Sequence, residues 1–404
     1  MSVMGAPTAT TEQAPGWRGR LQRALRRQRR HAGRDATIGL VACAAIVLGA
    51  PQLPSASTGA VNPPVDDDAA FSAAFVGDIM TGRHVQEVVE HRGYASLLEP
   101  TRPLLEADYV SGNLEQVIAE DAEALPEADK FIHLSDGPEA VEALADAGFT
   151  TLTLANNHTM DHGIPGLEET IAAVEDAGLD HAGAGLDLAA AQEPAVAQHD
   201  DLTVATLSFT DSYVEGFPAR AFQGGVLTAE PDEVESLVEE TAAEADLTIA
   251  QFHWGEEYDL GPNADQRELA EVAAEAGADV IVGHHPHVLM PVERIDDALV
   301  LYSLGNFVFD QGWSRTRESA VARYELDADG TARVVLVPAL VREATPEPLT
   351  GPLSPYRRAR IAQQLQGAGL DWEREGIALV AELDHGHVLE GHEQDPGTAE
   401  ARDG

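Results

Sequence analysis

Five short apolar segments, each followed by side chains able to bind a metal ion, constrain the fold of this chain more than any other feature. These are AAFVG before Asp78, ADYVSG before Asn113 and Glu115, FTTLTLA before Asn156, Asn157 and His158, DLTIAQF before His253, and ADVIVG before His284, His285 and His287. Apolar runs of this length are typical of buried β-strands. Because the carboxyl ends of parallel strands form the ligand-binding crevice of an open α/β sheet, we expect the five clusters to converge.

Helical stretches rich in Ala and Glu separate these segments, at about residues 137–147, 164–177, 231–245 and 263–276. Glycines near their ends, Gly148, Gly178 and Gly277, are expected to cap them. The alternation of strands and helices predicts a layered α/β domain. After Pro291 the sequence changes to VERI, LVLYSL, SAVARYEL and ARVVLVPALV. This part predicts antiparallel strands, the last two joined by a hairpin at residues 327–330.

The amino-terminal region predicts a membrane anchor. Residues 1–35 contain eight arginines, and the uncharged stretch over residues 36–55 is long enough for a short membrane span. Because arginines that flank a span stay in the cytoplasm, we expect a cytoplasmic leader at 1–35 and a single-pass protein of the cell membrane whose remaining domain is extracytoplasmic. A cleaved secretory signal is the alternative, since the small residues of PSASTGA follow the span. Residues 56–70 have the composition of a linker.

The carboxyl-terminal region is expected to follow a main domain at residues 71–345. Residues 346–384 contain PYRRARIAQQL and DWEREGIALVAEL, whose periodicity predicts a helical extension. Residues 385–404 are acidic and lack an apolar period, which predicts a disordered tail. Cys43 is the only cysteine, so a disulfide framework and a thiolate metal cluster are excluded.

The charge of the chain restricts its partners. With a formal net charge of −44 at pH 7, the chain would repel DNA, RNA and anionic membranes, so we expect no nucleic-acid partner. Lys130 is the only lysine. This acid-rich, lysine-poor composition fits adaptation to high salt as well as a biased genome composition, and both stay open.

The polar residues at the strand ends form a nitrogen and oxygen ligand set: Asp78, Glu115, Asn157, His253, His285 and His287. Such a set suits divalent transition ions such as Mn²⁺, Zn²⁺, Fe²⁺ or Ni²⁺ and suits Ca²⁺ poorly. Two ions that share a carboxylate acidify a water and clamp a tetrahedral centre, which predicts hydrolysis of an ester or amide. His158 would then protonate the leaving group, and Asp161 would orient His158.

Each of these residues also has a structural explanation when it is taken alone. Asp78 and Glu115 could be turn or cap residues, and His253 could be a hydrogen-bonded core histidine. The cluster GHHPH at residues 283–287 is more specific, because three histidines around one proline after an apolar strand have few structural uses. The coincidence of five such clusters therefore favours a metal site.

Seven motifs occur in order over roughly residues 73–341: GDIMTGR, SGNLE, LANNHTMDHGIPGL, GAG, HWGEEY, VGHHPHV and YSLGNFVFDQ. Together they resemble the bacterial capsule-synthesis CapA family, also called poly-γ-glutamate synthesis PgsA-like proteins. The resemblance implies a calcineurin-like metallophosphatase fold, which is a four-layer α/β/β/α sandwich. It also implies a first ion held by Asp78, Glu115 and His287, a second held by Asn157, His253 and His285, and His158 as the acid.

The chain departs from the metallophosphatase pattern at two places. The pattern has a histidine where this chain has Met80, and its GDxxD box appears here as Gly112-Asn113-Leu114-Glu115. The first ion thereby loses a ligand, so we expect two ions per chain with weaker occupancy of the first.

The resemblance also implies partners in capsule synthesis. These are an anionic polymer such as poly-γ-glutamate or its precursor, and the membrane subunits of a capsule synthase or exporter. Two functions stay open: a metal-dependent hydrolase at the outer membrane face, and a non-catalytic accessory subunit that binds or exports the nascent polymer. Nucleotide hydrolysis fits the fold but not the acidic charge.

Overall fold

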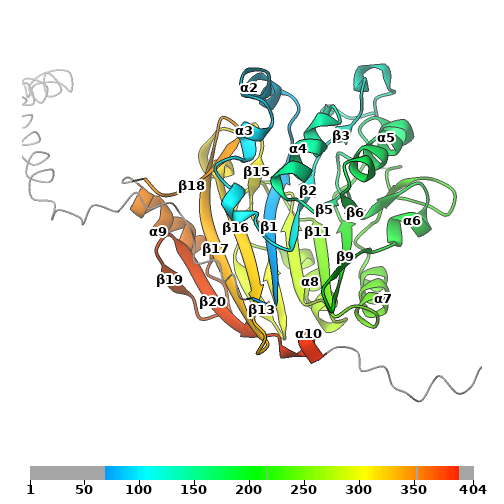
Figure 1. Cartoon of the computed structure of the whole chain (residues 1–404). Coiled ribbons are helices and arrows are strands. Elements are labelled where there is room, and N and C mark those ends of the chain that lie inside the picture. The colour runs from blue at the N-terminus through cyan, green and yellow to red at the C-terminus, as the bar shows by residue number, and fades with distance from the viewer. Residues whose placement is uncertain (1–68, 215, 352–353, 391–404) are drawn as a thin grey trace, which may run out of the picture. The chain divides into compact units, whose positions relative to one another are not determined.

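The computed structural model describes residues 69–390 with the exception of residues 215 and 352–353 (Figure 1). The predicted leader at 1–35, the predicted anchor at 36–55 and nearly all of the linker at 56–70 lie outside the described residues. Within residues 69–390, apart from these gaps, no helix has both the length and the apolar character needed to cross a membrane.

Two sheets dominate the described part of the chain, which confirms the predicted mixed α/β fold. The larger sheet contains β1 (Phe71–Ile79), β2 (Tyr109–Leu114), β5 (Thr151–Thr153), β6 (Asp180–Ala182), β15 (Asn306–Val308), β16 (Glu318–Leu326), β17 (Thr331–Arg342), β18 (Thr345–Pro348), β19 (Glu373–Glu375) and β20 (Ala378–Asp384). The smaller sheet contains β8 (Ala195–His199), β9 (Leu202–Thr210), β11 (Leu247–His253), β12 (Val280–His284), β13 (Val292–Ile295) and β14 (Ala298–Leu301). Two short pairs join β3 (Val117–Ile118) to β4 (Ser135–Asp136) and β7 (Ala184–Gly185) to β10 (Gly225–Val226).

Helices cover the outer faces of both sheets (Figure 1). The α-helices are α2 (His84–Arg92), α3 (Ala95–Leu98), α4 (Glu139–Ala147), α5 (Gly163–Asp176), α6 (Leu188–Gln192), α7 (Pro231–Ala242), α8 (Ala264–Glu275), α9 (Ser354–Leu365) and α10 (Gly386–Glu390). Single 3-10 turns lie at Arg102–Leu104, Ala122–Ala124 and Ser314–Arg317. The predicted helices correspond to α4, α5, α7 and α8, and each observed end lies within three residues of its expected position.

Three hydrophobic clusters separate four layers in the order α/β/β/α. The first cluster packs α4 and α5 on the larger sheet, for example through Val141 and Leu167. The second lies between the two sheets and includes Phe75 and Ile249. The third packs α7 and α8 on the smaller sheet. Strands such as β1 are mostly apolar because both of their faces are buried in this arrangement.

The strand-rich region after Pro291 is only partly antiparallel. β16 and β17 form the predicted hairpin, with Leu326 opposite Ala332. The segments VERI and LVLYSL instead form β13 and β14 of the smaller sheet, and β14 pairs in parallel with β12. This pairing supplies hydrogen-bond partners to a buried strand edge that would otherwise lack them.

The prediction of a fully helical extension at residues 346–384 is wrong in its second half. PYRRARIAQQL lies within α9, but DWEREGIALVAEL forms β19 and β20, and β20 pairs with β17. Its apolar residues alternate between two cores, with Ala378 and Val380 in one and Leu379 and Ala381 in the other. A segment that is apolar at both odd and even positions matches a helix and a strand buried on both faces equally well. The segment forms a strand because the edge of β17 is free to pair with it.

The predicted disordered tail at 385–404 begins with ordered residues. His385 is fully buried, with its Nδ1 2.8 Å from the Tyr324 hydroxyl, and it is followed by α10. In α10, His387 Nε2 lies 2.6 Å from Asp279 Oδ1. Residues 391–404 lie outside the described residues.

A close approach of backbones positions the first predicted ligand. A Cβ atom at Gly77 would lie 1.7 Å from the Gly305 carbonyl oxygen, so only glycine fits there. This contact lets β15 run beside the end of β1 and places Asp78 opposite Asn306.

Candidate metal centre

The strand ends singled out in the sequence come together where the two sheets meet. β1, β2 and β5 of the larger sheet deliver Asp78, Glu115 and the loop of Asn157, while β11 and β12 of the smaller sheet deliver the histidines. Register places Asp78 beside Asn113 on the first sheet and His253 beside His284 on the second. The predicted ligands Asp78, Glu115, His253, His285 and His287 are all buried, and Asn157 is half-buried.

The acidic and histidine ligand atoms fall into two overlapping groups, each small enough to surround one cation. Glu115, His285 and His287 form one group, and Asp78, Glu115 and His253 form the other, with ligand atoms within 4.8 Å of one another. Glu115 belongs to both groups, which is the position of a bridging carboxylate between two ions. The groups divide the histidines differently from the resemblance, which implies that His287 and Asp78 share an ion.

Unpartnered buried atoms indicate that the site is built for a cation. Nδ1 of His285 and Nδ1 of His284 are buried and have no hydrogen-bond partner among the described residues. His284 Nδ1 lies 3.6 Å from Asp78 Oδ1, and His284 Nε2 lies 3.1 Å from Gln251 Oε1. A buried nitrogen without a partner costs free energy unless something binds it. Together with the nitrogen and oxygen donor set, this fits divalent transition ions.

Asn113 occupies the middle of the site, although sequence reasoning assigned it no role. Its Nδ2 donates to Asp78 Oδ1 at 2.9 Å and lies 3.2 Å from His253 Nδ1. Its Oδ1 accepts a hydrogen bond from Asn156 Nδ2 at 3.0 Å. The motif SGNLE contained the signal, because Asn113 stands at the first acidic position of the metallophosphatase box.

His287 is oriented by a second asparagine that sequence reasoning missed. His287 Nδ1 lies 2.9 Å from Asn306 Oδ1 and 3.1 Å from Asp78 Oδ2, so this nitrogen carries the proton and donates. Its Nε2 consequently faces Glu115 Oε1 at 3.7 Å. A histidine ligand whose other nitrogen donates to an oxygen is the usual arrangement around a metal ion. Asn306 belongs to the motif YSLGNFVFDQ, for which no role was predicted.

Burial and mutual contacts shift the pKa values of both carboxyl groups. Burial raises the pKa of Glu115 well above its usual range, an effect larger than the lowering by His287. At Asp78, burial is outweighed by contacts with His284 and His287, which hold its pKa well below the usual range. The site thus contains one firmly ionised carboxylate and one carboxyl group that needs a nearby cation to ionise.

The pKa values of the three histidines His253, His285 and His287 are also shifted in different directions. Burial would lower the pKa of His287, but the carboxylates of Glu115 and Asp78 outweigh it and raise this pKa to about 9. Burial and the charge of His287 lower the pKa of His285 to about 4. Burial, with a contribution from His285, holds the pKa of His253 well below its usual range. A proton on His287 therefore takes the place of a cation in the metal-free protein.

In the metal-free protein, obtained with a chelator, the free energy of unfolding is expected to fall as pH rises from 6.5 to 9. The pKa of His287 is raised above its unfolded value of about 6.5, so its contribution is complete below pH 6.5 and is lost through pH 9. The difference between the folded and unfolded pKa of His287 corresponds to at most about 3 kcal/mol of stability. The raised pKa of Glu115 also makes stability fall as pH rises. Thermal unfolding in a chelator at several pH values measures the slope.

His287→Asn provides the control for this slope, because the acidic chain has other sources of pH dependence. The variant is expected to show a shallower fall in melting temperature than the unmodified protein between pH 6.5 and 9. Equal slopes for the two proteins would contradict the assignment of the proton to His287.

His158 and Asp161 are in direct contact beside the metal ligands. His158 Nδ1 donates to Asp161 Oδ2 at 2.7 Å, and both side chains are buried. Asp161 Oδ2 also accepts from the Leu134 backbone at 2.7 Å. Burial lowers the pKa of His158, more than Asp161 raises it. The imidazole is consequently neutral at pH 7 in the metal-free protein, and a proton-donor role requires an anionic substrate that raises its pKa.

Lys130, the only lysine, is part of the same cluster. Its Nζ donates to Asp161 Oδ1 at 2.6 Å and to the Asn157 carbonyl at 2.7 Å, and it lies 3.2 Å from His158 Nδ1. Lys130 thereby pairs with the Asp161 carboxylate next to His158 and fixes the loop that carries Asn157. The sequence marked it only by its rarity.

Met80, where the chain departs from the metallophosphatase pattern, is a packing residue in the structure. Met80 is fully buried in the cluster between the larger sheet and its helices. Its backbone N–H donates to the Val308 carbonyl at 2.8 Å. A thioether in this position extends the hydrophobic core instead of the ligand set.

Comparisons with known proteins relate the chain to capsule synthesis. It matches the family model for bacterial capsule synthesis protein PGA_cap over residues 72–311. It is 42% identical over 324 residues to the PGA biosynthesis protein CapA of Bacillus subtilis, covering 80% of this chain and 85% of that protein. It is also 42% identical over 326 residues to the capsule biosynthesis protein CapA of Bacillus anthracis, covering 79% of each.

A solved structure, the NAD nucleotidase of Haemophilus influenzae, is 13% identical with a TM-score of 0.37, covering 76% of this chain and 65% of that one. Similarity of this size supports no conclusion about fold or activity.

Proposed function

Because the chain belongs to the bacterial capsule synthesis protein family PGA_cap, we propose that it is a metal-dependent hydrolase of capsule or poly-γ-glutamate biosynthesis. The substrate would be an anionic polymer, its precursor or a phosphoester. We further propose that residues 36–55 anchor the chain in the cell membrane with the described domain outside the cytoplasm. The arginine-rich leader followed by an uncharged stretch supports this orientation.

The observation that carries the proposal is the pair of ligand groups that share Glu115. The four-layer packing is the architecture expected of a metallophosphatase-like protein and supports the same interpretation. Bound divalent ions would supply Lewis acidity and lower the pKa of a water. The ions would be held by the candidate ligands Asp78, Glu115, Asn157, His253, His285 and His287.

Other residues of the site would have separate tasks. His253 Nε2 lies 3.2 Å from Asn157 Oδ1, so these two side chains could contribute ligand atoms to the same ion. His158 directly follows Asn157 in the chain, which places it beside the candidate ligands. A neutral His158 oriented by Asp161 can accept a proton and return it to a leaving group.

Elemental analysis of the purified full-length chain tests the proposal. We expect close to two transition ions per chain at saturation, one of which is held more weakly because the chain has Met80 in place of a ligand. Inductively coupled plasma mass spectrometry with an independent protein concentration gives the ratio. A protein that binds no transition metal under saturating conditions would contradict the proposed hydrolase.

A non-catalytic accessory subunit is the second candidate function. It is supported by the departures at Met80 and Asn113, which weaken the metallophosphatase ligand set. A related protein from Mycobacterium tuberculosis is named a probable polyglutamine synthesis accessory protein. It is 27% identical over 279 residues, covering 58% of this chain and 73% of that protein. The two functions differ in whether capsule formation requires the His158 side chain.

A further inference from the structure

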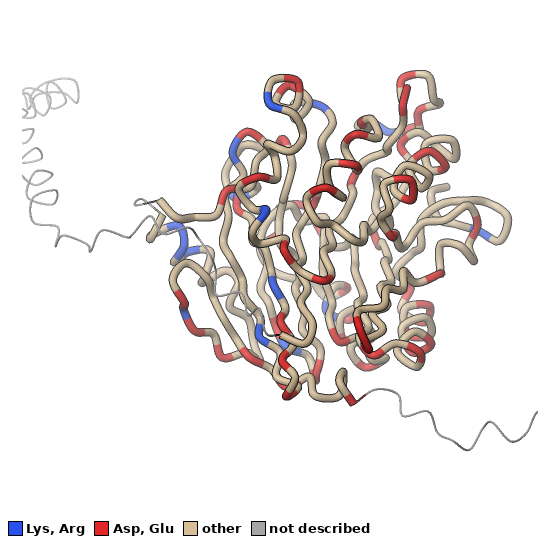
Figure 2. The backbone as a smooth tube through the Cα atoms, in the orientation of Figure 1, with Lys and Arg blue, Asp and Glu red and all other residues tan. Residues whose placement is uncertain are grey.

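Basic side chains are distributed unevenly over this acidic chain. Between Phe131 and Gln266, Arg220 is the only arginine or lysine, whereas α9 alone contains three arginines. Figure 2 shows acidic residues over most of the described backbone and a group of basic residues at α9. The surroundings of α9 are therefore a favourable place to hold an anion.

Most arginines near α9 already have a partner on the protein. Arg357 and Arg360 pair with Glu318, and Arg342 pairs with Glu347 at 3.3 Å. Arg358 and Arg374 differ, because neither guanidinium has an ion pair or hydrogen bond among the described residues. Like Arg220, these two arginines lack an ion pair among the described residues although the chain contains 69 acidic residues.

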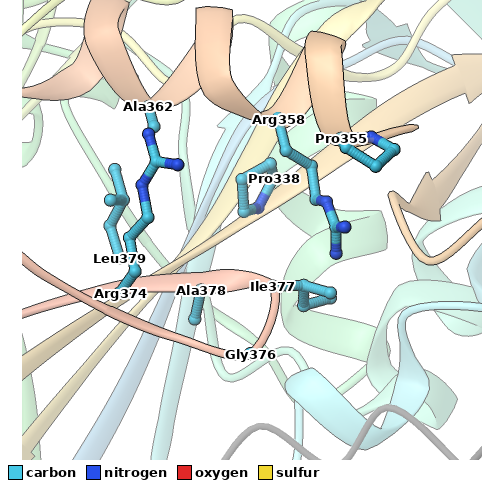
Figure 3. Close-up of a pocket in the computed structure, with 9 residues that line it drawn as sticks. All are labelled: Pro338, Pro355, Arg358, Ala362, Arg374, Gly376, Ile377, Ala378 and Leu379. Carbon is cyan, nitrogen blue, oxygen red and sulfur yellow. The ribbon is translucent and has the colours of Figure 1, made fainter. Parts of the chain in front are cut away.

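The two unpaired arginines face one cavity. Arg358 points from α9 toward the turn at Gly376, and Arg374 points from β19 toward Ala362 of α9 (Figure 3). The cavity has a volume of about 120 Å³ and is otherwise lined mainly by apolar groups, including Ile377. This volume accommodates a carboxylate or phosphate group.

We propose that the cleft between α9 and the β19–β20 hairpin binds a carboxylate of an acidic chain through Arg358 and Arg374. Each guanidinium offers a planar fork of donors that matches a carboxylate. A bound anion also relieves the repulsion between two like charges that face one cavity.

A neighbouring hollow favours a chain over a single small ion. It has a volume of about 620 Å³, lies at the start of α9, and is lined in part by Arg342, Glu347, Tyr356 and Arg357. An extended acidic chain could continue from the cleft along this surface. α9, β19 and β20 contain none of the predicted metal ligands, so the inference does not depend on hydrolysis, and only the choice of a γ-glutamyl chain rests on the proposed function.

Site-resolved chemical protection tests the cleft. The full-length chain is treated with phenylglyoxal, and modification of each arginine is followed by peptide mass spectrometry with and without tri-γ-glutamate. We expect tri-γ-glutamate to slow modification of Arg358 and Arg374 by about threefold or more. Arg220, which is exposed and has no ion pair, is expected to react at an unchanged rate.

Variants and a second probe separate a built site from general attraction. Arg358→Gln should abolish the protection of Arg374, whereas the matched control Arg220→Gln should preserve it. Inorganic phosphate is expected to protect less than tri-γ-glutamate at equal charge concentration. Protection that is equal at Arg220, or that survives Arg358→Gln, would overturn the proposal. Protection seen only after residues 391–404 are removed would also overturn it, since the chain's own acidic tail would then be the occupant.

Discussion

Glu115→Gln is expected to lower the affinity for Mn²⁺ or Zn²⁺ by about a hundredfold or more, because Glu115 supplies oxygen atoms to both groups of ligand atoms. The substitution conserves shape and removes one negative charge from a fully buried site. Loss of that charge weakens attraction for both ions in surroundings where charges are poorly screened. Isothermal titration calorimetry of the metal-free protein measures the affinity for the ion, and elemental analysis measures the number of ions per chain.

The folded state should tolerate this change. Burial raises the pKa of Glu115, so ionising this carboxyl group costs free energy in the metal-free protein, and a neutral amide of the same shape fits the position. Glu257→Gln is the matched control, because Glu257 is an exposed neighbouring acid outside both ligand groups. We expect less than about a threefold change for that variant. If both variants lost affinity equally, the site would be attracting cations through its general field and not through a bridging carboxylate.

His158→Ala is expected to reduce the rate of hydrolysis by about a hundredfold to ten-thousandfold, the usual contribution of a positioned acid or base. Metal content should stay unchanged, since His158 belongs to neither group of ligand atoms. The assay uses a chromogenic phosphodiester and a γ-glutamyl anilide with the metal-loaded protein. Measured rates are compared at equal metal occupancy, so that lost metal is not mistaken for lost chemistry.

Two further variants distinguish chemistry from a change in structure. Asp161→Asn keeps the shape but removes the acceptor charge that orients His158, so we expect a smaller loss than for His158→Ala. His133→Ala is the matched histidine control, since its Nε2 contacts only the Ala128 carbonyl at 2.9 Å. An unchanged rate for His158→Ala would remove His158 from the mechanism.

The same variant separates the two proposed functions in cells. If the chain acts as a hydrolase, His158→Ala should abolish capsule formation while the protein is still produced at its normal level. If the chain is an accessory subunit, capsule formation should persist. In the second case a wild-type protein that loads metal without turning over either chromogenic substrate would be consistent with the accessory function.

Much of the fold could be predicted because its signals are local. The strands before Asp78 and His253 are buried on both faces, so most of their positions are apolar and they are recognisable without knowledge of their neighbours. Gly148 adopts a φ of 107° at the end of α4, as the position of a capping glycine predicts. The helix expected over DWEREGIALVAEL failed for the opposite reason. Its pattern matches two structures, and only the unpaired edge of β17 selects the strand.

The features of the candidate site also divide into those with local signals and those that depend on tertiary packing. The sequence alone was enough to single out the candidate ligands at five strand ends and the pairing of His158 with a nearby carboxylate, because residue chemistry and short spacing carry that information. The roles of Asn113, Asn306 and Lys130, the unpartnered nitrogen of His285 and the place of Glu115 in both groups required the packing of the two sheets. Distances between residues far apart in the chain depend on how whole layers pack, and no local pattern encodes them.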